Sequence, residues 1–194
     1  MFVDDVPALT DGRRRRSQQS RDKIIAAMMS LVEEGQASPI AEQVAERAQV
    51  GLRSVFRHFN DMDSLFAEMA ARLAKHYQPA LAPFASADWQ GRLGEAIERR
   101  ISIYEKVLPY KRAADAHRHN SPAIQMNHAQ TNQLLRARLR SLLPPRLADD
   151  TLALETLDFL LSVDTWQRLR LEQNLPVETA RAIVEAQIKV LLEN

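Results

Sequence analysis

Two groups of arginines are the residues of this sequence best suited to bind a polyanion. Residues 13–16 are four consecutive arginines, and two more basic residues follow by position 23. Arg53 and Arg57 are four residues apart, so they would share one face of a helix. Arginine binds phosphate oxygens and can form paired hydrogen bonds with the edge of a guanine. These groups favour contact with a nucleic acid, although a charge run can also be a solvated tail.

Other side chains with chemical potential have the wrong spacing for catalysis or metal binding. His117 and His119 are two residues apart and would diverge by about 200° on a helix, so they cannot reach one ion together. Glu155 and Asp158 share a helix face, but a lone acidic pair is usually a surface feature. The sequence lacks cysteine, a glycine-rich phosphate loop, a nucleophile elbow and a His-Glu-x-x-His motif. We therefore expect no enzyme, no metal site and no cofactor.

Composition points to a soluble helical protein. The chain has 194 residues, a net charge of +1 and no run of eighteen apolar residues that could cross a membrane. The N-terminus lacks the basic start and apolar stretch of a signal peptide, so we expect a cytoplasmic protein without a membrane partner. Strong helix formers dominate and strict apolar–polar alternation is absent. The expected fold class is therefore all-α.

Proline, glycine and small polar residues divide the chain into about nine expected helices. Two of them begin with an N-cap and a first-position proline, at Ser38-Pro39 and at Ser121-Pro122. The expected helices cover about 18–34, 39–47, 52–58, 61–78, 88–107, 110–119, 122–143, 150–172 and 177–193. The proline at position 109 is expected to end the fifth helix.

The second and third expected helices are joined by only about four residues, from Ala48 to Gly51. This spacing is typical of a helix-turn-helix, a DNA-binding module in which two helices meet at a sharp angle. Apolar side chains at Val44, Val55 and Phe59 would pack the module together, and the remaining face of the third helix would be exposed. The candidate DNA contacts are Arg13, Arg14, Arg15, Arg16, Ser38, Gly51, Leu52, Arg53, Ser54, Phe56, Arg57 and His58.

The segment 40–59 resembles the DNA-binding motif of the tetracycline-repressor (TetR) family. In that family the motif closes with an aromatic residue, a variable residue, histidine and phenylalanine, and Phe56-Arg57-His58-Phe59 is similar. A second stretch, Trp166 to Leu175, resembles the end of the penultimate helix of these proteins, with Asn174 at a position where glycine is common.

Four positions depart from the family pattern. Gln49 stands where glycine is usual and would have to adopt positive φ. Gly51 replaces the usual Ser or Thr cap, Phe56 replaces a tyrosine, and Met62 replaces a common phosphate-binding lysine. These departures put DNA affinity in question. They keep open a helical interaction protein that no longer binds DNA, with a helical-bundle enzyme as a further alternative.

The resemblance implies a flexible basic arm (1–16), a helix-turn-helix domain (17–63, motif about 40–59) and a helical ligand-binding and dimerisation domain (64–194). It implies a transcriptional regulator, with a repressor favoured. A homodimer would bind a pseudo-palindromic operator in double-stranded DNA and be released by a small-molecule inducer.

The resemblance also implies a pocket for a small apolar or amphipathic ligand in the C-terminal part. Residues that could line it are Met69, Leu73, Tyr77, Trp89, Tyr104, Tyr110, Met126, Phe159 and Trp166. The helix expected over 150–172 is apolar nearly all round, so it needs cover on two sides. The expected cover is a second copy, or else the interior of a monomer. Candidate dimer contacts are Leu157, Leu161, Ile183, Val184, Ile188 and Leu191.

Overall fold

The computed structural model describes residues 8–193 of the chain. Helices and the connections between them account for this whole range, which contains no β-strand, so the expected all-α class is confirmed. Within the same residues, no helix combines the length and the apolarity needed to cross a lipid bilayer. Part of the arm expected over 1–16 lies outside the described residues.

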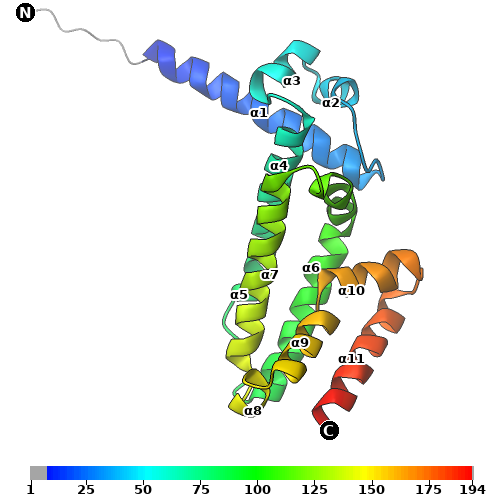
Figure 1. The fold of residues 1–194 in the computed structure, drawn as a ribbon. Helices are drawn as coiled ribbons and strands as arrows, with labels where there is room; N and C mark the ends of the chain where they lie inside the picture. Colours follow the sequence, from blue (N-terminus) through cyan, green and yellow to red (C-terminus); the bar gives the residue numbers. More distant parts are fainter. Residues whose placement is uncertain (1–7, 194) are drawn as a thin grey trace, which may run out of the picture. The chain divides into compact units, whose positions relative to one another are not determined.

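The helices belong to two compact units (Figure 1). The first unit contains the described residues up to Arg72 together with Pro109–Ile124, and the second contains Leu73–Leu108 and the described residues from Gln125 on. In chain order the elements are α1 (Ala8–Glu33), α2 (Ala41–Ala48), α3 (Leu52–His58), α4 (Met62–Leu73), η1 (Ala74–Tyr77), α5 (Gln78–Leu81), α6 (Trp89–Arg118), α7 (Pro122–Leu142), α8 (Pro145–Ala148), α9 (Thr151–Leu160), α10 (Val163–Gln167), η2 (Arg168–Glu172) and α11 (Val177–Glu193). Residues 64–72 and 109–124 thus pack with the N-terminal helices, although the expected boundary lay at residue 63.

Helix α1 begins at Ala8, ten residues before the start at residue 18 that we expected. The arginine run is therefore helical, where we expected a flexible arm. Arginine and glutamine favour the helix, and the cost of one internal glycine, about 1 kcal/mol, is small beside the packing of the rest of the helix. The four arginines at residues 13–16 are held on the exposed surface of α1.

The core of the first unit is a three-helix contact among α1, α2 and α3. Helix α1 contributes Ile24 and Met28, which are fully buried, at the helical spacing expected for a core face. Val44 on α2 and Val55 on α3 close the core from the other side. Each fully buried side chain of this size stabilises the fold by about 1.5–3 kcal/mol. The expected packing of the helix-turn-helix is confirmed.

In the second unit, the long helix expected over 150–172 is broken after Leu160. Asp150 caps α9 by accepting hydrogen bonds from the amides of residues 152 and 153. After α9, Ser162 accepts a hydrogen bond from the Thr165 amide at 3.0 Å and starts α10. A serine that caps a new helix competes with continuation of the old one. The uncovered carbonyl at the break, that of Leu161, receives side-chain donors from α6.

Pro109 does not end its helix, contrary to expectation. Helix α6 continues through it as far as Arg118. Proline removes one backbone hydrogen bond, but Leu108 and Tyr110 on either side are buried. Their packing outweighs the loss. The chain passes from one compact unit to the other at this proline.

Candidate nucleic-acid interface

The turn between α2 and α3 is built around one residue in the left-handed conformation. Gln49 has φ 54° and ψ 45°, and this positive φ is the one expected from its position in the motif. The Val50 amide donates to the Ala45 carbonyl at 3.0 Å, which satisfies an open carbonyl at the end of α2. Gly51 is extended, with φ −69° and ψ 146°, and it precedes α3 directly. A tight helix-turn-helix connection results.

The start of α2 differs from the expected Ser38-Pro39 cap. The helix begins at Ala41, and the Ile40 amide donates to Gln43 Oε1 at 3.0 Å. Ser38 lies further back in the loop, where its Oγ is 3.3 Å from His117 Nε2. A contact between Ser38 and DNA remains a prediction, but the expected helix-capping role of this serine is wrong.

The outward face of α3 carries two cations and two apolar side chains. Arg53 and Arg57 are exposed, and neither lies within 4.0 Å of a carboxylate among residues 12–193. Leu52 is 38% exposed and Phe56 is 46% exposed. An exposed apolar side chain beside unpaired arginines suits a DNA groove, because thymine methyl groups are read by apolar contact and guanine by arginine. Ser54 is half-buried on the same short helix.

His58 differs from the other candidates because the protein surrounds it. Its side chain is half-buried, and Nε2 is enclosed without a hydrogen-bond partner. Burial lowers the pKa of His58, and the neighbouring charges of Arg57 and Arg21 lower it further. The imidazole is therefore neutral near pH 7 and adds no positive charge to the surface of α3.

Other arginines of the same unit are paired and hold helices together. Arg21, on α1, donates to Glu68 of α4 at 2.8 Å, so it belongs to the framework even though it follows the arginine run in sequence. Arg47, on α2, forks onto both oxygens of Glu34 at 2.6 and 2.7 Å. These carboxylates have lowered pKa values, first because of the hydrogen bonds from their arginines. The first unit thus contains arginines that form ion pairs within the fold and arginines that face solvent.

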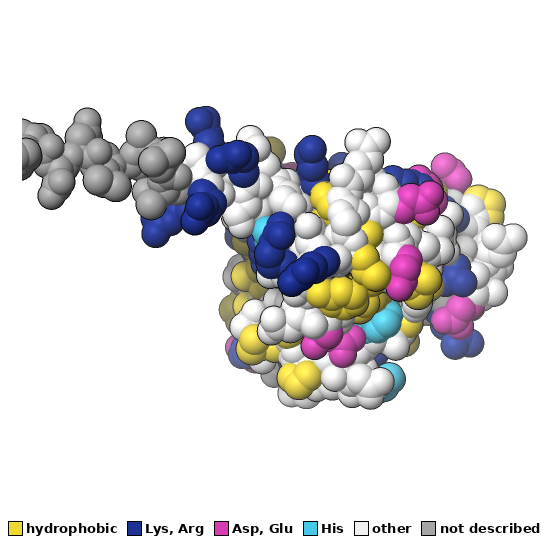
Figure 2. Space-filling view, turned by 90° about the horizontal axis from the view of Figure 1, so that it is seen from above, with side chains coloured by type: hydrophobic (Ala, Val, Ile, Leu, Met, Phe, Trp, Pro, Cys, Tyr) yellow, Lys and Arg dark blue, Asp and Glu magenta, His cyan; other side chains and the backbone are white. Residues whose placement is uncertain are grey.

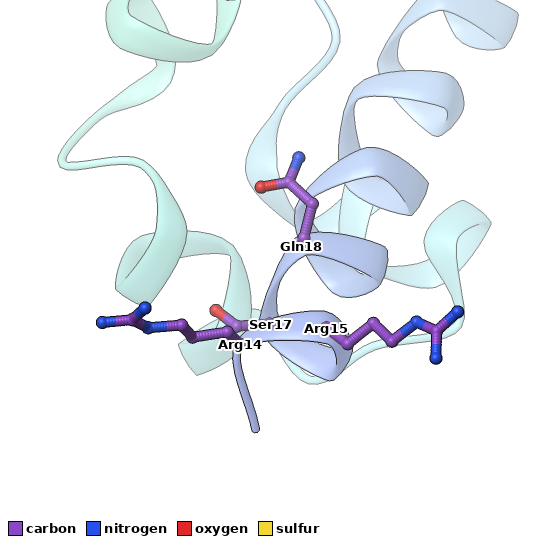
Figure 3. Close-up of a pocket in the computed structure, with 4 residues that line it drawn as sticks. All are labelled: Arg14, Arg15, Ser17 and Gln18. Atoms are coloured by element: carbon purple, nitrogen blue, oxygen red, sulfur yellow. The ribbon is translucent and has the colours of Figure 1, made fainter. Parts of the chain in front are cut away.

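The arginine run forms an exposed basic surface on α1. Lys and Arg side chains gather over the N-terminal part of this helix (Figure 2). Arg14 and Arg15 point to opposite sides of α1 and, with Ser17 and Gln18, border a shallow open hollow (Figure 3). Arg16 folds back, and its Nε donates to the Gly12 carbonyl at 3.2 Å. A rigid helix that carries cations on two sides can follow a phosphate backbone.

The candidate ligand residues are distributed over both compact units and differ in their exposure. Met69 and Tyr110 belong to the first unit, whereas the other candidates belong to the second. Met126 and Phe159 are 58% and 67% exposed. The polar ends of the buried aromatics are already occupied, because Tyr104 Oη donates to the Leu161 carbonyl, Trp166 Nε1 donates to Glu105, and Tyr110 Oη donates to Glu33. Burial raises the pKa of Tyr104 to about 12. Met69 and Leu73 are buried, while Tyr77 and Trp89 are half-buried.

Most candidate dimer residues are buried inside the chain's own core. Leu157, Leu161, Val184 and Ile188 are at most 4% exposed, so a partner could not contact them without opening the unit. Leu191 is half-buried and Ile183 is 38% exposed. Helical spacing identifies an apolar face but does not show which of two apolar faces is covered within the chain.

Sequence reasoning missed a group of three arginines in the second unit. Arg99 and Arg100 on α6 and Arg138 on α7 border one cavity of about 10 Å³, which is room for about one water molecule at most. Arg100 is only 4% exposed. A usable signal was present, because Arg100 lies between Ile97 and Tyr104 on a face of α6 that is otherwise apolar. A charged residue at a core position is uncommon and usually has a specific role.

This chain is similar in structure to proteins that are already known. No protein-family model matches the sequence, and no curated protein matches it. A crystal structure of a transcriptional regulator from Rhodococcus sp. Rha1 matches with a TM-score of 0.70 at 21% identity, covering 89% of this chain and 96% of that chain. A provisionally assigned TetR-family transcriptional regulator from Rhodococcus sp. matches with a TM-score of 0.63 at 16% identity, covering 89% and 98%. A provisionally assigned regulator from Streptomyces coelicolor A3(2) matches with a TM-score of 0.62 at 23% identity, covering 89% and 98%. The chain shares its fold with these proteins over most of its length.

Proposed function

We propose that this chain is a TetR-type transcriptional regulator that binds double-stranded DNA through α3 and the N-terminal part of α1. The observation that carries the proposal is the exposure of Arg53 and Arg57 on the outward face of a helix-turn-helix. Both arginines lack a carboxylate partner among residues 12–193, while Arg21 and Arg47 in the same unit are paired. Unpaired cations on a recognition helix are available to phosphates and guanines.

The two basic surfaces have different tasks in this proposal. Arg53 and Arg57, with Leu52 and Phe56 beside them, read base edges in the major groove. The arginines at 13–16 contact phosphates without regard to sequence, since they lie on a helix with no reader residues around them. Specificity therefore comes from α3, and a large share of the salt-dependent affinity comes from α1.

A second copy of the chain supplies the other half of the DNA site. Leu152 and Phe159 are seven residues apart on α9, share one face, and are 76% and 67% exposed. Ile183 is exposed on α11, which packs beside α9 in the same unit (Figure 1). Water-exposed aromatic and leucine side chains on neighbouring helices favour a protein contact. A dimer with two-fold symmetry would bind half-sites about 34–36 Å apart, or a multiple of that distance.

Regulation by a small molecule completes the proposal. A ligand that binds the second unit would favour one spacing of the two DNA-binding units over another, and so change DNA affinity by differential binding. Loss of DNA binding on ligand addition corresponds to a repressor that is released by its inducer, which is the mode that the TetR resemblance favours.

DNA binding is tested by selecting duplexes from a random library and titrating the best one with salt. Arg53→Ala or Arg57→Ala should weaken the selected duplex by about 5–150-fold, the range for loss of a base-reading arginine. Replacing Arg13 to Arg16 by glutamine should weaken all duplexes alike and reduce the salt slope. Arg140→Ala, an exposed arginine on α7, is the control and should leave affinity unchanged. Weak, sequence-blind binding that ignores both α3 variants would favour the alternative of a helical interaction protein.

Dimerisation is tested by sedimentation of the full chain. Phe159→Glu should shift the protein to monomer because it places a charge in the proposed contact. Leu134→Glu, at a leucine on α7 that is 43% exposed, is the matched control and should leave the dimer intact. Equal mass for the wild type and both variants would show that this face of α9 is not the interface.

A further inference from the structure

Arg99, Arg100 and Arg138 of the second unit line a cavity whose other lining residues are apolar. Arg99 and Arg100 lie on α6, and Arg138 lies on α7. The remaining lining residues are Ala80, Ala96, Leu135, Leu139 and Leu142. Small-molecule sites typically combine an apolar lining with a few placed polar groups. Three arginine residues that border one otherwise apolar cavity are an arrangement that suits an anion with a hydrocarbon part.

Arg100 is a buried cation held by neutral groups. Its Nη1 donates to the Leu161 carbonyl at 2.9 Å and its Nη2 donates to the Leu135 carbonyl at 2.7 Å. No carboxylate of residues 12–193 lies within 4.0 Å of it, although Asp158 is near enough to interact through its charge. Burial of a cation without a bonded anion costs free energy, so an anion bound near Arg100 would be stabilised there.

The guanidinium of Arg138 has one of two adjacent hydrogen-bond donors without a partner. Its Nη2 donates to the Ala82 carbonyl at 2.8 Å, while its buried Nε has no hydrogen-bond partner. The Nε and Nη2 edge of a guanidinium is a pair of parallel donors that matches the two oxygens of a carboxylate. In the structure, one of these donors is satisfied by a backbone carbonyl and the other is not.

The segment before α6 covers this site with contacts that an anion could replace. Arg99 donates to the carbonyls of Ala82 and Pro83 at 2.6 and 2.8 Å. The Phe84 ring lies 4.9 Å from the Arg99 guanidinium and 4.2 Å from that of Arg138. Hydrogen bonds from arginine to carboxylate are roughly twice as strong as those between neutral groups. A carboxylate therefore competes well with the two carbonyls for these donors.

We propose that this cavity is the effector site and that it takes an amphipathic monocarboxylate. The carboxylate bonds to the Nε and Nη2 edge of Arg138 near Arg100, and the hydrocarbon part lies along the leucines of α7. Glu95 neutralises Arg99 at 2.9 Å, and Asp158 offsets part of the charge of Arg100, which leaves between one and two positive charges, enough to bind one carboxylate. Because the cavity holds about 10 Å³, residues 82–88 must move to admit the ligand. The inference rests on the proposed function, in which a small ligand regulates the protein.

The test compares octanoate with octan-1-ol as probes of the full-length protein by calorimetry. These probes have the same chain length and differ in charge. Octanoate should bind the wild type at least about tenfold more tightly than octanol, which is the weight of a charge-assisted hydrogen bond. Arg138→Gln should abolish this preference. Arg140→Gln, two residues along α7 and 56% exposed at its side chain, should retain it.

Equal binding of the two probes to the wild type, or no binding of octanoate, would overturn the inference whether or not the Arg138 variant folds. A preference for octanoate that Arg138→Gln leaves unchanged would also overturn it. DNA binding without ligand is measured on the same protein. If the protein binds DNA but shows no preference for octanoate, the regulator proposal is retained and the effector-site proposal is refuted. An octanoate preference that depends on Arg138 but comes without DNA binding supports the site and removes the regulator.

Discussion

Replacement of Gln49 by glycine should stabilise the protein. Gln49 has φ 54° and ψ 45°, a conformation that costs an L-residue about 1–2 kcal/mol and glycine almost nothing. Glycine loses about 0.5–1 kcal/mol more backbone entropy on folding than other residues, which offsets part of this gain. The Gln49 side chain is exposed, so its removal costs little packing. We expect a net gain in unfolding free energy of about 0.5–1 kcal/mol, or about 1–4 °C in Tm for a chain of this size.

The assay is urea unfolding of the wild type, Gln49→Gly and Gln49→Ala, with thermal melting as a second readout. Gln49→Ala is the matched control, because it removes the same side chain and keeps the left-handed strain. Its stability should lie within about 0.5 kcal/mol of the wild type. Alanine and glycine variants of equal stability would refute the reasoning, since positive φ would then carry no measurable cost. A glycine variant less stable than the wild type would refute it more strongly.

Three further changes test the local chemistry. Gly51→Ser should raise the unfolding free energy by about 0.5–1 kcal/mol, because an added Cβ meets no atom within 4 Å and the hydroxyl can cap α3; urea unfolding measures it. Because the pKa of His58 is lowered in the folded protein, its contribution to the unfolding free energy is complete above about pH 6.5 and is lost as pH falls through the folded pKa. His58→Gln should therefore reduce the loss of unfolding free energy at acidic pH. Tyr104→Phe removes a buried 2.7 Å hydrogen bond to the Leu161 carbonyl and should cost about 0.5–1.5 kcal/mol in the same unfolding assay, since Arg100 still serves that carbonyl.

Local spacing in the sequence was enough to identify the helix-turn-helix. Val44 and Val55 were expected in its core and are at most 1% exposed. Gln49 and Asn174 were expected at positions that favour positive φ, and they have φ 54° and 53°. These features depend on residues within a few positions of one another, because helical periodicity and turn conformation are set by neighbours along the chain. For the same reason the exposed arginine face of α3 could be assigned before the structure was known.

Tertiary structure alone decided which charges are free and which faces are covered. Arg21 closely follows the arginine run in sequence, yet it is bound to Glu68, 47 residues away. Pro109 lies within a helix because packing on both sides outweighs one lost hydrogen bond. Arg100 donates hydrogen bonds to carbonyls 35 and 61 residues away, and these bonds hold its side chain beside the proposed effector cavity. Partners so distant along the chain leave no periodic signal. The sequence therefore determined the helix-turn-helix, while long-range packing determined which arginines remain unpaired.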